Sequence, residues 1–252
     1  MATANGYDPF SHGAQLQGYQ SPRISFFRDF LVEGTATTGS NTTEWFTSLT
    51  GSGTSLIRDD QPGGVIRLLT GATDDNQTDI QLNGESFGCV TGKSIDFAAR
   101  VALEDVDLSD FFIGLADTNT DVTNGVVAAI GFRSGTTSAL EDQAALDIIA
   151  CNASAGTAWT STTTQTASDT GVNAADNTFQ IFSFHVDVTS ASSSATSGTI
   201  RFYIDNALVA THTTNLPLNS AAEALTPTLA ISCQSGAAEA LDCDWIYVAQ
   251  DR

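Results

Sequence analysis

The sequence has 252 residues, enough for one large all-β domain or for two smaller domains. Hydrophobic residues make up 41% of it, so a sizeable core can be buried, whereas charged residues make up only 15%. Nine basic residues against 29 acidic ones give a formal net charge of -20. Such a field repels nucleic acid and anionic lipid, so we expect neither nucleic acid nor membrane among the partners.

The first residues lack the features of a secretion signal. Met1–Phe10 has neither a basic start nor an apolar stretch. No apolar run in the sequence approaches the length that a membrane span requires. This predicts synthesis as a soluble cytoplasmic protein without a signal peptide.

Residues 1–22 differ in composition from the rest of the chain. Gly, Gln, Ser, Tyr, Pro and His dominate them, without a sustained periodicity. We expect an extended N-terminal arm with no fold of its own, followed by one domain over residues 23–252. Tyr7, Phe10 and Tyr19 are candidates for contacts with a partner surface, and a frayed terminus is the alternative interpretation.

Beyond this arm, short apolar or alternating runs are separated by turn residues. In Ile95–Leu103 apolar side chains occupy every second position, and Asp96 and Arg100 fall on the opposite face, which is the pattern of a half-buried strand. Ile200–Ile204 alternates in the same way, and Asp205-Asn206 predicts a tight turn after it. The further predicted strands are Ile24–Phe30, Val65–Leu69, Ile80–Leu82, Phe111–Ala116, Val126–Phe132, Leu146–Cys151, Phe179–Val188, Ala207–His212, Thr228–Cys233 and Asp244–Val248.

Two polar tracts interrupt these runs. Thr157–Asn177 surrounds Trp159 with Ser, Thr, Ala and Asp, and Thr189–Ser197 is almost entirely Ser, Thr and Ala. Their composition predicts surface loops, and Ser138–Ala145 predicts at most one helical turn. Roughly a dozen short strands with frequent turns, and no internal repeat, predict a single all-β antiparallel sandwich.

Several segments, in their order along the chain, resemble the concanavalin A-like lectin/glucanase superfamily, which includes laminin-G-like modules and family-16 glycosidases. Phe182–Val188 is similar to the strand before the family's hairpin, Thr199–Pro217 to the hairpin, and Leu241–Gln250 to the closing strand. Phe27–Phe30 followed by Trp45 resembles the opening of such domains. The resemblance covers roughly residues 24–250 and implies a single antiparallel jelly-roll β-sandwich.

The same resemblance implies a non-enzymatic function. Phe112–Ala116 is similar to a strand of such domains among phage structural proteins. With the arm, the acidic polar composition and the missing secretion signal, this implies a non-enzymatic virion surface protein: a capsid decoration or head-fibre protein. Its expected partners are capsid or other virion proteins and further copies of the chain, most simply in a trimer. The expected location is the virion, after synthesis in the host cytoplasm.

We find no catalytic constellation. Family-16 glycosidases carry Glu-x-Asp-x-(x)-Glu on a strand, so that alternate carboxyl groups project into one cleft. None of the seven glutamates sits in such a pattern, and Glu104–Asp107 is the nearest approach. His12, His185 and His212 accompany no nucleophile elbow. We therefore predict no catalytic residues and no enzyme, and a divergent glycosidase is the third hypothesis.

Two acidic segments are candidate calcium ligands. Asp117-Thr-Asn-Thr-Asp121 places oxygen atoms at alternate positions, as calcium loops do. Asp74, Asp75, Asn76 and Asp79 form a second group. Solvated turns are the default explanation for both, because turns use Asp and Asn. We predict no metal and no cofactor, and calcium stays an alternative because many members of the resembled superfamily bind it.

The four cysteines, Cys89, Cys151, Cys233 and Cys243, match no zinc-binding spacing. Buried free thiols are the favoured interpretation. Cys233 and Cys243 lie symmetrically about Gly236–Glu239, so a hairpin at that point would allow a disulfide.

Carbohydrate binding, as a lectin-like or receptor-binding module, is the alternative function. Lectin-like sites on the resembled fold use aromatic and amide side chains on a concave face or on rim loops. Trp159, in its polar tract, is the candidate for such a contact, whereas Trp45 and Trp245 are expected in the core.

Overall fold

The computed structural model describes residues 23–30, 44–58, 64–106, 108–123, 126–134, 145–152, 165–220, 223–234 and 236–252. These residues form two antiparallel sheets, A and B, and no helix among them is long and apolar enough to cross a membrane. The arm of residues 1–22, Trp159 and the helical turn expected before Ala145 lie outside the described residues.

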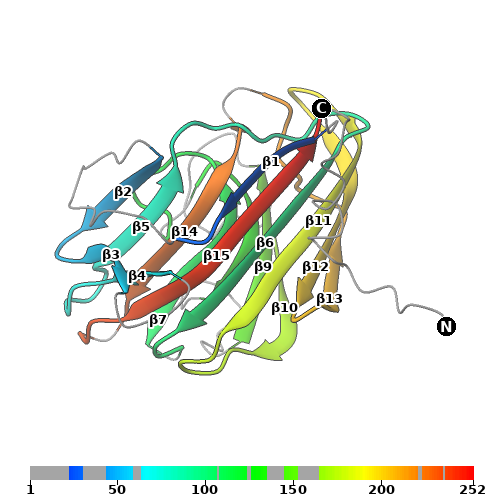
Figure 1. Ribbon diagram of the computed structural model, residues 1–252. Coiled ribbons are helices and arrows are strands. Elements are labelled where there is room, and N and C mark those ends of the chain that lie inside the picture. The colour runs from blue at the N-terminus through cyan, green and yellow to red at the C-terminus, as the bar shows by residue number, and fades with distance from the viewer. Residues whose placement is uncertain are drawn as a thin grey trace.

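Sheet A has eight strands, in the order β13-β12-β11-β6-β15-β4-β3, with β1 also paired to β15. Their bounds are β1 Arg23–Arg28, β3 Thr54–Arg58, β4 Val65–Leu69, β6 Ser94–Leu103, β11 Gln180–Ala191, β12 Thr196–Ile204, β13 Ala207–His212 and β15 Ala240–Asp251. β4 pairs with the first part of β15 and β1 with the second part. β15 therefore runs diagonally across the front layer between β1 and β6 (Figure 1).

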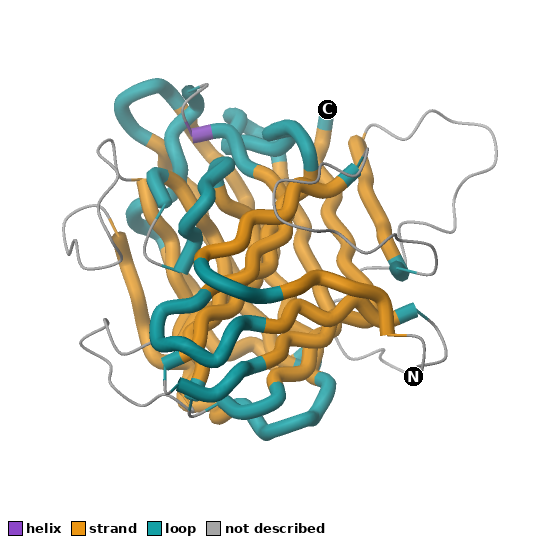
Figure 2. The backbone as a smooth tube through the Cα atoms, turned by 90° about the vertical axis from the view of Figure 1, so that its left-hand side faces the viewer, coloured by secondary structure: helices purple, strands orange, loops and turns teal. Residues whose placement is uncertain are grey.

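Sheet B has seven strands, in the order β10-β9-β8-β7-β14-β5-β2. Their bounds are β2 Trp45–Thr50, β5 Gln77–Leu82, β7 Ser109–Ala116, β8 Ala128–Ser134, β9 Ala145–Asn152, β10 Gln165–Asn173 and β14 Thr226–Cys233. Strands fill the body of the molecule, and the described loops join them mostly at their ends (Figure 2). The antiparallel jelly-roll sandwich that the sequence predicted is confirmed.

Aromatic side chains join the inner faces of the two sheets. Phe132 of sheet B contacts the rings of Phe182 and Phe202 of sheet A edge-on, with centroids 5.2 and 5.4 Å apart. Phe97 and Phe184 stack within sheet A at 4.9 Å. All five rings are fully buried, and each contributes about 1.5–3 kcal/mol through the hydrophobic effect. The alternation of β11 and β12 places Phe182, Phe184 and Phe202 on the inner face of sheet A.

The predicted loops contain more strand than their composition indicated. β10 lies within Thr157–Asn177, and Thr189–Ser197 is mostly the ends of β11 and β12, with a turn at residues 192–195. β10 is an edge strand that pairs only with β9 among the described strands. Edge strands need no apolar alternation, because one set of backbone hydrogen bonds holds them, so periodicity does not reveal them. The sequence also missed β2 and β3.

The cysteines are free and buried, as the favoured interpretation predicted. The hairpin that a disulfide would have required does not form, because Cys233 ends β14 in sheet B whereas Cys243 lies in β15 of sheet A. Cys233 Sγ instead donates to the carbonyl oxygen of Ala237 at 2.7 Å. The turn is thus an arch between the two sheets.

The two tryptophans of the described strands differ in position. Trp45 is in the core, as predicted, with the rings of Phe26 and Phe30 each 5.7 Å away. The prediction for Trp245 is wrong. A register shift in β15 between Cys243 and Trp245 places Trp245 opposite Arg100, half-buried on the outer face of sheet A.

Candidate functional site

Part of the outer face of sheet B is covered by the connection between β7 and β8, which we call the covering segment and of which residues 117–123 and 126–127 are described. Three alternate side chains of β5 accept its backbone amides. Asn119 N–H donates to Gln81 Oε1 at 2.8 Å, and Thr123 N–H donates to Gln77 Oε1 at 3.1 Å. Val122 N–H donates to Asp79 Oδ2 at 3.4 Å. Because alternate residues of a strand share one face, this fastens the segment along β5.

Gln81 ties the base of the covering segment to the sheet. Its side-chain Nε2 donates to the carbonyl oxygen of Asp117 and to Thr228 Oγ1 of β14, both at 3.0 Å. Asp117 Oδ1 accepts the backbone amide of Ala128 at 2.9 Å, and the two residues also pair through Asp117 N–H and the Ala128 carbonyl at 3.0 Å. Both ends of the segment are therefore anchored on the sheet.

A second hydrophobic cluster lies beneath the covering segment, separate from the main core. It consists of Phe112, Ala116, Val122, Val126, Ala129, Ile149, Cys151 and Ala230. Phe112 also lies directly over Gly131, where an added Cβ would be 2.9 Å from the ring. The part of the face beneath the covering segment is thus packed like an interior.

Buried acids accompany this cluster. Asp79 is fully buried, and desolvation raises its pKa well above the ordinary value despite the hydrogen bonds from Val122 and Gln77. Its Oδ1 makes no hydrogen bond. Burial likewise raises the pKa of Asp117 to about 6, against the opposing effect of the Ala128 amide. Both carboxyl groups are therefore structural groups held out of water.

Charged residues on the other half of sheet B are also buried. Arg133 of β8 is 2% exposed and lies opposite Asp147 of β9 in the register. Desolvation lowers the pKa of Arg133, and the charges of Asp147 and Asp110 oppose this. Asp110 and Asp147 are at most 7% exposed. A glycosidase needs two carboxyl groups open to one cleft, and these acids are not open to solvent.

The other candidate catalytic residues are scattered. Glu104 follows the end of β6, and Asp107 lies outside the described residues, as does His12. His212 is buried beside the ring of Phe202, and burial lowers its pKa. His185 lies in β11 of sheet A, the sheet that also contains β13 with His212, and its ring faces Asp96 and Asp187. The described candidates, Glu104, His185 and His212, form no common site.

The two segments that were candidates for calcium binding do not form a cluster of ligands in the described residues. Asn119 Oδ1 accepts the amide of Asp121 at 3.0 Å, so that part of the first motif is a hydrogen-bonded turn. In the second group Asp74 and Asp75 are exposed, whereas Asp79 is buried under the covering segment. Across the described ranges, no three His, Cys, Asp or Glu residues are grouped so that they could hold a metal ion. The calcium alternative therefore rests on the sequence.

A pocket of about 420 Å³ opens where β2 and β5 meet the covering segment. It is lined by Phe46, Leu82, Asn83, Gly84, Thr118, Asn119 and Thr120. Hydrogen bonds shape its wall: Ser48 Oγ donates to the Thr120 carbonyl at 2.9 Å, and Thr118 N–H donates to Glu85 Oε1 at 2.8 Å. An aromatic ring, two amides and several hydroxyls are the groups that orient a polar ligand in a concave site.

Sequence reasoning did not identify this pocket. It singled out Asp117–Asp121 for its acids, whereas the pocket uses the Thr and Asn residues of the same motif. The Asn83-Gly84 pair after β5 was the available signal, because Gly84 has a φ of 90° and turns the chain away from the rim.

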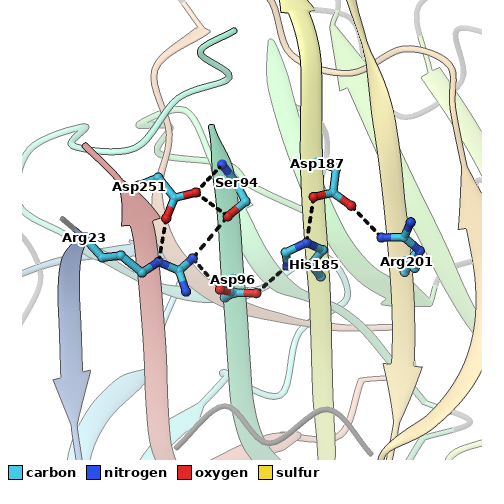
Figure 3. A network of polar contacts seen from close by, with 7 residues as sticks. All are labelled: Arg23, Ser94, Asp96, His185, Asp187, Arg201 and Asp251. Carbon is cyan, nitrogen blue, oxygen red and sulfur yellow. Dashed lines mark hydrogen bonds and ion pairs between the residues drawn. The ribbon is translucent and has the colours of Figure 1, made fainter. Parts of the chain in front are cut away.

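The outer face of sheet A carries an ion-pair network across five strands (Figure 3). Arg23 pairs with Asp251 at 3.0 Å and with Asp96. Asp96 Oδ1 is 2.6 Å from His185 Nδ1, and Asp187 Oδ1 is 2.9 Å from His185 Nε2. The hydrogen bond with Asp96 is the main cause of the raised pKa of His185.

The network ends at Arg201, whose Nη1 is 2.6 Å from Asp187 Oδ2. Ser94 Oγ donates to Asp251 at 2.7 Å at the other end. Both ring nitrogens of His185 face a carboxylate, so His185 has no nucleophile to activate there. The network is a chain of alternating acidic and basic side chains across the sheet.

Solved structures of carbohydrate-active proteins share this fold. The endo-1,3-beta-glucanase from Streptomyces sioyaensis matches 92% of this chain and 98% of its own, with a TM-score of 0.55 and 13% identity. A family-16 endo-glucanase from Bacteroides ovatus matches 88% and 99%, with a TM-score of 0.55 and 12% identity. The carbohydrate recognition domain of Emp46p matches 82% and 88%, with a TM-score of 0.50 and 8% identity.

No protein-family model and no curated protein matches the chain. At identities of 8–13% the structural likeness concerns the fold. The chain therefore has the antiparallel jelly-roll sandwich of the concanavalin-like glucanases and lectins.

Proposed function

We propose that the chain is a non-enzymatic virion surface protein, a capsid decoration or head-fibre protein that attaches to a phage particle and presents its sandwich outward. The observation that carries the non-enzymatic part is the covered outer face of sheet B. Its four acids, Asp79, Asp110, Asp117 and Asp147, are at most 7% exposed. A substrate would have to displace the covering segment to reach Asp79, which accepts a hydrogen bond from its Val122 amide.

The virion part is supported by the sequence. The acidic, Ser- and Thr-rich composition suits a protein that stays soluble at high copy number. The strand Phe112–Ala116, which resembles strands of phage structural proteins, contributes Phe112 and Ala116 to the hydrophobic cluster beneath the covering segment. A rigid, sealed sandwich is suited to display, because its function depends on shape and attachment.

The test is to locate the protein on particles of the phage that encodes it. Gold-labelled antibody against the full chain should label the outside of the head at regular positions in electron micrographs. The purified chain should release no reducing sugar from laminarin. Absence of the chain from purified particles would refute the virion role. Turnover that is lost with Asp110→Asn or Asp147→Asn would establish the divergent glycosidase instead.

A second candidate function, carbohydrate binding, is favoured by the pocket at Phe46. Its ring offers a stacking surface, and Asn83 and Asn119 offer amides. Neighbours of the same fold include a glucanase and a carbohydrate recognition domain. We propose a neutral oligosaccharide as the ligand, because the net charge of -20 disfavours anionic sugars.

A glycan array followed by calorimetry tests this candidate. Binding with a Kd below about 1 mM should weaken at least about tenfold with Phe46→Ala or Asn83→Ala. The matched control is Phe27→Ala, which removes a ring that is 50% exposed on the other sheet and should leave binding unchanged. Binding that survives both pocket variants would place the glycan elsewhere, and no binding on the array would refute the candidate.

A further inference from the structure

The turn that follows β5 has an asparagine directly before a glycine, at the rim of the pocket at Phe46. Asn83 and Gly84 both line this pocket, and both are exposed. Among the asparagines that the structure describes, Asn83 alone precedes a glycine. The side chain of an asparagine can react with the backbone nitrogen of the next residue, and glycine hinders this reaction least because it has no Cβ. The pair is therefore a candidate site of covalent modification.

The turn is fastened at both ends and open between them. Asn83 N–H donates to the carbonyl oxygen of Glu44 at 2.8 Å, and Ser86 N–H donates to the carbonyl oxygen of Leu225 at 3.1 Å. Between these two anchors, Gly84 N–H donates no hydrogen bond to any residue that the structure describes. A backbone nitrogen in a hydrogen bond must lose that bond before it can react. The nitrogen of Gly84 is available without this step.

There is also room for the reaction at Gly84. A Cβ added to this residue would meet no atom within 4 Å, and its φ of 90° is a conformation that glycine adopts without strain. The reacting nitrogen and the side-chain carbon of Asn83 belong to adjacent residues, so the reaction requires only rotations within an exposed turn. We therefore expect the folded chain to react at a rate close to that of the unfolded chain.

We propose that Asn83 is a site of spontaneous deamidation through a cyclic imide, which gives the pocket at Phe46 a second form that carries a carboxylate. The nitrogen of Gly84 loses its proton to hydroxide and attacks the side-chain carbonyl carbon of Asn83, forming a five-membered ring. The bond from this carbon to the amide nitrogen breaks, and that nitrogen takes a proton from water and leaves as ammonia. Water then opens the ring at either of its two carbonyl groups, giving aspartate or isoaspartate.

Both products change the wall of the pocket. Each replaces a neutral amide by a carboxylate, next to Glu85, whose Oε1 already accepts the Thr118 amide at 2.8 Å. Isoaspartate also adds a carbon atom to the main chain between the anchors at Glu44 and Leu225. A pocket rim of amides and hydroxyls thus acquires a negative charge, which disfavours anionic ligands further. The inference does not depend on either of the proposed functions.

Peptide mapping of the full chain after incubation at about pH 8 tests the proposal, with an unincubated sample digested in parallel. Trypsin releases the peptide Leu68–Lys93, which contains Asn83 and Asn76. We expect a mass gain of about one dalton at Asn83, with isoaspartate as well as aspartate among the products. Asn76 is the internal control, because it is 8% exposed and precedes a glutamine. The Asn-Gly pairs at residues 5–6 and 124–125 lie outside the described residues and on other peptides.

Two comparisons separate the effect of the fold from that of the dipeptide. The same incubation in guanidinium chloride gives the rate of the unfolded chain, and the folded rate at Asn83 should lie within about tenfold of it. Asn83→Gln should abolish the mass gain, because a glutamine must close a larger ring. A folded chain that reacts more than about tenfold more slowly than the unfolded one would overturn the proposal, since the turn would then protect the pair. Aspartate without isoaspartate, or a gain that survives Asn83→Gln, would overturn it as well.

Discussion

The two outer faces of the sandwich differ in how far their side chains are buried. On sheet B, β7 and β14 are buried at every position, and Phe112 and Ala116 of β7 and Ala230 of β14 share a hydrophobic cluster with the covering segment. On sheet A, β12 alternates between buried and partly exposed residues, and its outer residues belong to an ion-pair network. Burial at every position thus marks the face that carries the covering segment, whereas the alternating burial of β12 marks a face that is partly open there.

The largest expected difference between the faces concerns packing. Phe112→Ala, under the covering segment, should lower the free energy of unfolding by about 3–5 kcal/mol, as for other buried Phe residues. Phe27→Ala, on the open face, should cost less than about 1 kcal/mol. Urea denaturation measures both. Equal losses would contradict the view that the outer face of sheet B is packed like an interior.

The next effect concerns the hydrogen bonds that anchor the covering segment. Gln81→Ala removes the acceptor of the Asn119 amide and the donor to the Asp117 carbonyl. We expect a loss of about 1–3 kcal/mol, because buried partners are left without hydrogen bonds. Hydrogen exchange should accelerate at the Asn119 amide, while amides of β11 in the same variant serve as the control. Unchanged protection at Asn119 would show that other contacts hold the segment.

The sequence predicted the side chains on the inner faces of the two sheets better than those on the outer faces. The alternation of Ile95–Leu103 reports which side chains enter the core, and β6 occupies the same residues with Ser94 added. Trp245 shows the limit, because a register shift in β15 reverses the faces after Cys243 and periodicity alone does not reveal it. Polar edge strands such as β10 were missed for another reason, because they lack apolar alternation.

The candidate sites were harder to predict, because they depend on contacts distant in sequence. Asp117–Asp121 was singled out for its acids, yet its role follows from Gln77 and Gln81, some forty residues earlier. The pocket at Phe46 requires β2, which the sequence analysis missed. The acidic residues drew attention to the covering segment, but its role in the fold is visible only together with β5, on which it lies.

Asp79 should give a smaller, pH-dependent effect. Its pKa is raised in the folded state, so the folded protein holds a proton that the unfolded protein releases near pH 4. Stability from this group is present at low pH and is lost as pH rises through the raised pKa. Asp79→Asn cannot ionise, so the variant should gain about 1 kcal/mol or more relative to the native chain at about pH 8.

Urea midpoints of both proteins at several pH values measure this gain. The control is Asp75→Asn, an exposed aspartate in a turn with a φ of 64°, a conformation that Asn tolerates. This variant controls for the replacement of an aspartate by an asparagine outside the buried face. An Asp79→Asn difference that is constant with pH would mean that Asp79 is not desolvated by the covering segment.

The smallest effect is expected from His185 on the open face. Asp96 and Asp187 face its ring and favour the charged form, so its pKa is raised. Its stabilisation is fully present below about pH 6.5, the unfolded value, and is lost as pH rises through the folded pKa. His185→Gln should therefore cost less than about 1 kcal/mol at low pH and less still at high pH, since the side chain is 25% exposed.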